Sequence, residues 1–68
     1  MGKLKWYRIV DEINGDVCWN VEAQNEKSAL KKYRTGLLTT GIYEIIMEAD
    51  GRFRLVSSYG SCFRADAA

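Results

Sequence analysis

The sequence predicts an α+β fold of order ββαββ, in which a four-stranded antiparallel sheet carries one helix packed on one face. Two segments rich in β-branched and aromatic residues are each divided by a turn signal, Asn14-Gly15-Asp16 in the first and Asp50-Gly51 in the second. Between them, apolar residues recur at helical spacing. With 68 residues and no proline, we expect a single domain built from a hairpin over 3–23, a helix over 25–38, a hairpin over 41–59 and a short C-terminal tail over 60–68.

The first hairpin is indicated by the alternation of apolar and polar residues from Val17 to Ala23. A three-residue loop over 14–16, or a bulge, collects the apolar side chains on one face, whereas a two-residue turn scatters them over both. The pairs expected from the three-residue loop are Ile13 with Val17, Ile9 with Val21, and Tyr7 with Ala23. Trp6 and Val10 then point away from this face.

The helix is expected to begin after Asn25, whose side chain suits an N-cap, and to place Glu26 at the positive end of the helix dipole. Its apolar positions are Ala29, Leu30, Tyr33 and Leu37. Gly36 or the Thr39-Thr40-Gly41 stretch is expected to end it.

The second hairpin is expected to turn in two residues at Asp50-Gly51. This turn places Ile46 opposite Leu55, Ile45 opposite Val56, and Met47 opposite Arg54. One face of this hairpin is then expected to lie in the core, with the side chains of Ile42, Ile46, Phe53, Leu55 and Tyr59. In the tail, Phe63 can dock on the sheet, while Ala65 to Ala68 are expected to fray.

Composition excludes several classes of function. Ten Lys and Arg against nine Asp and Glu leave a net charge of +1, which by itself points to neither nucleic acid nor an anionic membrane. The chain contains no His, no nucleophile elbow and no glycine-rich phosphate loop. We therefore expect no enzymatic activity, no catalytic residue, no cofactor and no metal site. No apolar run is long enough to span a membrane, and none resembles a signal peptide, so we expect a cytoplasmic protein with no membrane partner.

Cys18 and Cys62 are the only thiols of the chain. Two cysteines without a histidine cannot complete a structural zinc site. Because a reducing compartment is expected, both should be free thiols rather than a disulfide.

One helix covers only one face of a sheet, so the other face is a candidate partner site. The residues expected there are Tyr43, Met47, Val56, Arg52 and Arg54, extended by Trp6 and Tyr7 of the first hairpin. Aromatic, Met and Arg side chains of this kind are enriched in protein interfaces. Three alternatives stay open: a partner, a weak homodimer of an otherwise monomeric chain, or cover by the tail.

The helix offers a second candidate surface, because it carries four basic residues against Glu26. Lys31, Lys32 and Arg34 are candidates for a non-specific contact with DNA phosphates. A solvated lysine face without a ligand is the alternative.

The chain resembles the phage-encoded anti-CRISPR proteins that inhibit the type I-F surveillance complex. The resemblance is carried by Tyr7, Val21-Glu22-Ala23, Ala29, Lys31, Gly41, Ile46, Asp50-Gly51, Phe53, Gly60 and Phe63. It implies a small antiparallel sheet with one helix, and a non-enzymatic phage protein that binds a bacterial CRISPR–Cas effector complex in the host cytoplasm and blocks access of target nucleic acid. Lys31 keeps a basic side chain where the family has one, whereas Leu30 and Ser57 replace lysines, so protein subunits of the complex are the implied partner. The chain also resembles small phage and plasmid proteins of the DpnD/PcfM kind.

Two other functions compete with inhibition. One is a small nucleic-acid-binding module that uses the basic helix. The other is an accessory phage protein without an inhibitory role.

Overall fold

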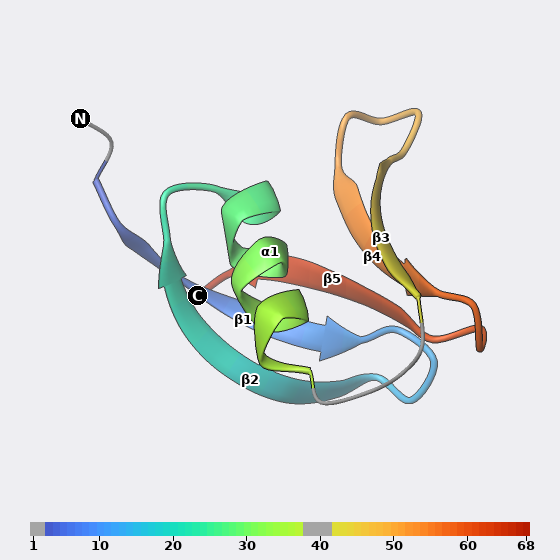
Figure 1. Ribbon diagram of the computed structural model, residues 1–68. Coiled ribbons are helices and arrows are strands. Elements are labelled where there is room, and N and C mark those ends of the chain that lie inside the picture. The colour runs from blue at the N-terminus through green and yellow to red at the C-terminus, as the bar shows by residue number, and fades with distance from the viewer. Residues whose placement is uncertain (1–2, 38–41) are drawn as a thin grey trace.

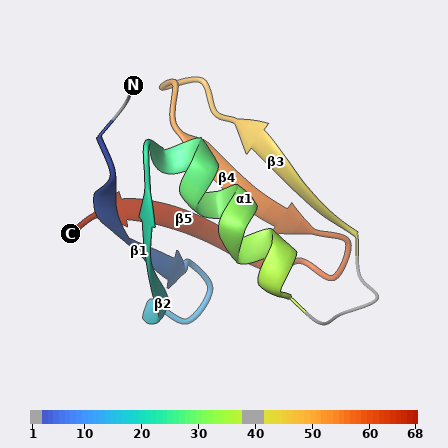
Figure 2. The same cartoon turned by 60° about the vertical axis from the view of Figure 1, so that its left-hand side comes forward.

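The fold is α+β, with one helix lying across one face of an antiparallel sheet (Figures 1 and 2). The computed structural model describes residues 3–37 and 42–68. Its elements are β1 (Lys5–Asp11), β2 (Asp16–Ala23), α1 (Glu26–Gly36), β3 (Tyr43–Met47), β4 (Phe53–Ser57) and β5 (Cys62–Ala67). The sheet has five strands in the order β2-β1-β5-β4-β3, so the expectation of four strands is wrong.

The fifth strand is formed by the tail that was expected to fray. β5 lies in the middle of the sheet and pairs with β1 from Tyr7↔Ala67 to Asp11↔Phe63. A three-residue loop leads into it, in which Gly60 adopts a positive φ of 89° and donates its N–H to the Ser57 carbonyl. In this strand the buried Phe63 and Ala65 alternate with Arg64 and Asp66, which is the pattern of a strand with one buried face.

The first hairpin forms as expected, but with a different register. Asp11 pairs with Asp16 across a four-residue loop, and a bulge interrupts the ladder between Ile9 and Val10. Ile9 therefore lies opposite Trp19 and Tyr7 opposite Val21. This shift of two residues keeps every side chain of residues 5–9 on its expected face, because strands alternate with period two.

The helix begins where the sequence indicates. Asn25 is the N-cap, and its side-chain oxygen accepts a hydrogen bond from the Ser28 N–H at 2.9 Å. Ala29 and Leu30 are buried, and Tyr33 and Leu37 pack beside them, as expected. α1 ends at Gly36; the expected end at Leu38, like the start of the second hairpin at Gly41, lies outside the described residues.

The second hairpin is shifted by one residue, which exchanges the two faces of β3, while Phe53 and Leu55 of β4 keep their expected face. Its loop has three residues, because the Glu48 N–H bonds to the Arg52 carbonyl at 2.7 Å and Gly51 closes the loop with a φ of 86°. Ile45 consequently faces Leu55, and Met47 faces Phe53. Tyr43 and Ile45 pack against the core, whereas Ile42, Ile46 and Tyr59, which were expected inside, are exposed.

The core lies between α1 and the sheet. Its buried members are Tyr7, Ile9, Val21, Ala23, Ala29, Leu30, Leu55, Phe63 and Ala65. Tyr33 of the helix touches both Trp19 and Phe63, with ring centroids 5.8 and 5.1 Å apart. Burial raises the pKa of Tyr33 to about 12, assisted by the neighbouring Cys18, so this phenol stays neutral.

Candidate binding surface

The residues expected to form one partner site do not share a surface. Tyr43 and Met47 lie on the helix-facing side of the sheet, whereas Arg54 and Val56 alternate onto the opposite side. Tyr7 is only 6% exposed and belongs to the core, so its assignment to a partner site is corrected. Trp6 remains exposed on the side away from the helix. The one-residue shift of the second hairpin moves Tyr43 and Met47 to the helix side. Tyr7 is buried because it shares the helix-facing side of β1 with Ile9.

Three arginines in the C-terminal part of the sheet are engaged by carboxylates. All six ion pairs among the described residues involve Arg52, Arg54 or Arg64. They link into one series, called here the ion-pair chain: Glu48, Arg54, Glu12, Arg64, Asp66, Arg52 and Glu26. Within it, Glu12 joins two arginines, since it lies 2.7 Å from Arg54 Nε and 3.5 Å from Arg64. These arginines therefore hold strands together instead of offering a free cation to a partner.

Arg52 occupies the place where β4 leaves β5. The two strands pair only at Leu55↔Phe63 and Val56↔Cys62 before the β3–β4 hairpin curves away (Figure 1). The guanidinium of Arg52 donates to the Ala65 carbonyl at 3.2 Å and to the Asp66 carboxylate at 3.0 Å. It thus satisfies a backbone acceptor that β4 no longer reaches.

The pKa values of the ion-pair chain reflect these contacts. The hydrogen bond to Asp66 and the charge of Glu26 raise the pKa of Arg52, and those to Glu48 and Glu12 do the same for Arg54. Burial alone would raise the pKa of Asp66, but hydrogen bonds from Arg52 and Arg64 together hold it below its ordinary value. All three groups are therefore charged at neutral pH.

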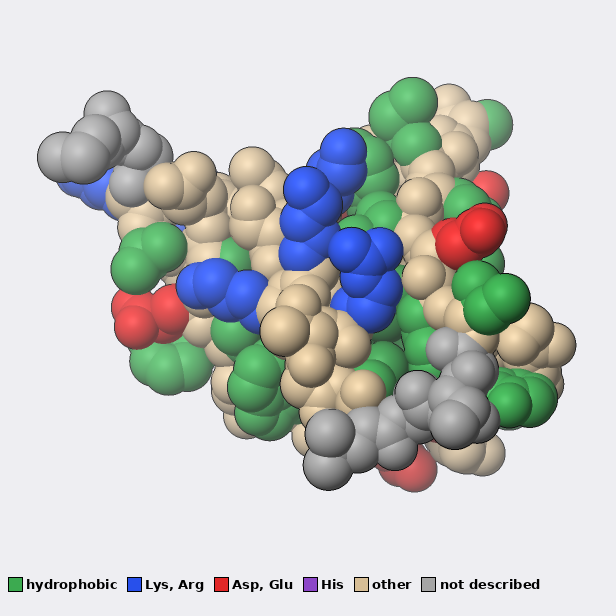
Figure 3. All heavy atoms as spheres, in the orientation of Figure 1, with side chains coloured by type: hydrophobic (Ala, Val, Ile, Leu, Met, Phe, Trp, Pro, Cys, Tyr) green, Lys and Arg blue, Asp and Glu red, His purple; other side chains and the backbone are tan. Residues whose placement is uncertain are grey.

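The helix carries a row of cations that make no ion pair with a carboxylate of the described residues. Lys27, Lys31 and Arg34 stand at spacings of four and three residues, which places them in one row along α1, called here the basic stripe. None of the ion pairs within residues 3–37 and 42–68 includes a member of this row or Lys32. Figure 3, with the helix in front, shows Lys and Arg side chains gathered over α1 and hydrophobic side chains beside them.

Two lysines of the helix make other contacts with the sheet. The Lys27 ammonium lies 5.6 Å from the centroid of the Phe53 ring on β4. Lys32 turns the other way and donates to the Glu22 carbonyl of β2. Of the predicted nucleic-acid contacts, Lys31 and Arg34 thus belong to the basic stripe, and Lys32 lies beside it.

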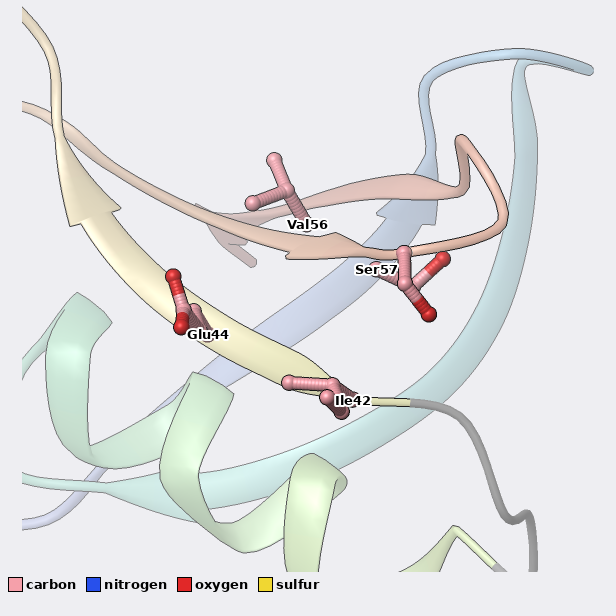
Figure 4. Close-up of a pocket in the computed structure, with 5 residues that line it drawn as sticks. Ile42, Glu44, Val56 and Ser57 are labelled. Carbon is pink, nitrogen blue, oxygen red and sulfur yellow. The ribbon is translucent and has the colours of Figure 1, made fainter.

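Two small concave sites lie on the described part of the chain. One shallow pocket of about 230 Å³ is lined by Ile42, Glu44, Val56, Ser57 and Ser58 at the β3 edge (Figure 4). Another, of about 290 Å³, lies between β2 and the end of α1 and is lined by Cys18, Trp19, Tyr33 and Gly36. Both volumes fall below the usual range of small-molecule sites.

No group of three Cys, Asp or Glu side chains suited to a metal ion occurs among residues 3–37 and 42–68. Over the same residues, no helix has the length and apolar character needed to cross a membrane.

Both cysteines are free thiols, Cys18 exposed and Cys62 half-buried. Burial raises the pKa of Cys62 above its ordinary value, and the nearby Glu12 carboxylate adds a smaller increase. We expect iodoacetamide at pH 8 to label Cys18 well before Cys62, and the rate at Cys62 to keep rising at more alkaline pH. Mass spectrometry of the adducts measures both rates, and equal rates in the native protein would contradict the prediction. In denaturant the two rates should converge.

Comparisons of the chain with protein-family models, curated proteins and solved structures gave no match.

Sequence reasoning missed the ion-pair chain, and Glu12 in particular. Glu12 lies in a turn and gives no pattern of its own, because its partners Arg54 and Arg64 are more than forty residues away in the sequence. The alternation of Arg64 and Asp66 with Phe63 and Ala65 was a usable signal for β5.

Proposed function

We propose that the protein is a non-enzymatic inhibitor of the phage anti-CRISPR kind, which binds a bacterial CRISPR–Cas surveillance complex and blocks its access to target nucleic acid. The resemblance described above supplies the partner. The basic stripe supplies the contact surface, and this replaces the sheet face that the sequence favoured.

The observation that carries the proposal is the unequal use of positive charge. Arg52, Arg54 and Arg64 are paired within the fold, whereas the basic stripe makes no ion pair among the described residues. Among the same residues Lys5 and Arg8 of β1 are also unpaired, but only the helix sets three such cations in one row. Lys27 and Arg34 are seven positions apart, which corresponds to roughly 10 Å along a helix axis. This length matches about three nucleotides of one strand, at roughly 3.4 Å each.

Phosphate or carboxylate groups are therefore the chemistry that this surface recognises. A CRISPR effector complex presents both a guide RNA backbone and the protein channel that receives the target. A helix face docked at that channel occupies the path of the target strand. Exclusion of the target then needs no bond to be broken, and the inhibitor needs no active site.

The test is target binding by a purified type I-F surveillance complex loaded with guide RNA. We expect increasing amounts of this protein to reduce binding of a labelled matching duplex, while the protein itself co-elutes with the complex. Undiminished target binding at saturating protein would contradict the proposal. Co-elution without loss of target binding would assign the protein to the complex but refute inhibition by exclusion.

The same basic stripe favours a second candidate, a nucleic-acid-binding module that acts without the complex. If this function is correct, the protein binds free duplex DNA, and three phosphate contacts give a slope of about −2.7 for log K against log salt concentration. If inhibition is correct, binding to the complex persists at about 150 mM salt, where a three-contact DNA interaction is weak.

A further inference from the structure

The outer edge of β3 has the features of a pairing surface. β3 is the last strand of the sheet, and it carries neither a bulge, a proline nor a lysine. The opposite edge strand, β2, is protected by its bulge and by the Lys32 ammonium bound to the Glu22 carbonyl. Natural proteins usually block sheet edges, so an unblocked edge indicates a strand that pairs with something.

The backbone of β3 divides into two sets of hydrogen-bonding groups. Glu48 and Ile42 bond to β4, through Arg52 and Ser58 respectively. In an antiparallel ladder the bonding residues alternate, so Glu44 and Ile46 also face β4. Tyr43, Ile45 and Met47 consequently direct their N–H and C=O groups toward the open edge. Around them, Ile42, Ile46 and Met47 are 66%, 36% and 68% exposed.

We propose that the β3 edge pairs antiparallel with the β3 edge of a second copy of this chain, with Ile45 opposite Ile45 at the two-fold axis. Three registers join more than one pair of outward-facing residues. The one centred on Glu44 sets two Glu44 carboxylates against each other, and the one centred on Ile46 sets Glu44 against Glu48. The register centred on Ile45 sets Glu44 against Ile46 and Tyr43 against Met47, so it avoids like charges directly opposite each other.

This pairing makes a continuous ten-stranded sheet from the two five-stranded sheets. Residues 43, 45 and 47 of both copies fall on the same side, because odd-numbered residues oppose odd-numbered residues in this register. The two-fold axis is therefore perpendicular to the sheet, and both helices lie on one side of the dimer. The inference rests on β3 alone and holds whether or not the proposed function is correct.

The experiment is sedimentation equilibrium of the full chain. Because only five residues pair, we expect a weak dimer, with the mean mass rising from 7.8 kDa toward twice that value as the concentration increases. A range of roughly 20 µM to 1 mM suits an interface below the standard size. A constant monomer mass over this range overturns the proposal and leaves the edge for an extended strand of another protein.

Met47→Pro and Met47→Ala distinguish the contribution of the backbone N–H to dimerisation from that of the side chain. Proline removes the outward N–H, which plays no part in the β3–β4 ladder, and it is tolerated on such an edge. We expect Met47→Pro to remain monomeric over the whole range and Met47→Ala to dimerise within about threefold of the parent. Dimerisation of Met47→Pro equal to that of the parent would assign the interface elsewhere and overturn the proposal.

Ile46→Glu and Ile46→Lys test the register at one exposed position. In the proposed register, residue 46 faces Glu44 of the second copy, so Ile46→Glu should weaken the dimer at least about tenfold while Ile46→Lys stays near the parent value. Equal weakening by both would place residue 46 opposite itself and overturn the register. Thermal unfolding confirms that each variant is folded, and this pair alone suffices if Met47→Pro does not fold.

Discussion

Deletion of residues 62–68 is expected to unfold the protein completely. β5 lies between β1 and β4, so its loss separates the two hairpins and leaves the β3–β4 hairpin without a neighbouring strand. The deletion also removes Phe63 and Ala65 from the core beneath the helix. A two-stranded hairpin is marginally stable by itself, and a domain of this size has little stability to spare.

Circular dichroism and thermal unfolding measure this effect. The matched control ends at Asp66 and lacks only Ala67 and Ala68, which are exposed. It retains Phe63, Ala65 and the Asp66 carboxylate, and we expect a cooperative transition from it. A cooperative transition from the chain that ends at Ser61 would show that the tail is dispensable, as the sequence alone suggests.

Two single substitutions in β5, one at a buried and one at an exposed position, test without deletion whether this strand is needed for folding. Ala65→Glu places a carboxylate at a position that is 0% exposed, and Ala67→Glu places it two residues further along the same strand, in solvent. Because burial of an unpaired charge is very costly, only the first should abolish the fold.

Reversing the charge of two residues of the basic stripe is expected to have the second largest effect, a loss of binding to the surveillance complex. We expect Lys31→Glu combined with Arg34→Glu to weaken binding to the surveillance complex roughly 30- to 1,000-fold at moderate salt. Each lost cation contributes up to about 1 kcal/mol, and each introduced carboxylate adds a repulsion of similar size. Both side chains are exposed, so the fold should be retained.

The control variant changes the same number of charges elsewhere. Lys5→Glu combined with Arg8→Glu alters two exposed cations of β1 that make no ion pair within the described residues. Fluorescence anisotropy of the labelled variants with the purified complex compares the affinities. Similar losses in both would assign the effect to net charge. Normal binding by the stripe variant would return the contact to the open sheet face, where Trp6 is exposed.

The sequence by itself determined the local elements of this protein. Asn25 caps the helix as its side-chain chemistry requires, and Ala29 and Leu30 face the core at the expected spacing. The turns at Gly15 and Gly51 lie where the sequence places them, because a positive φ is a property of the residue and its immediate neighbours. The basic stripe follows from the same local spacing.

Only the tertiary structure decided the register, the position of β5 and the partners of the arginines. Asp50-Gly51 is compatible with a two-residue and a three-residue loop, and the choice depends on whether Tyr43 and Ile45 or Ile42 and Ile46 fit beneath the helix. The tail becomes a strand because β1 and β4 supply hydrogen bonds on both of its sides. Arg54 reaches Glu48 within the β3–β4 hairpin, but it joins Glu12 only after the first hairpin and β4 have met, since these two residues are distant in the sequence.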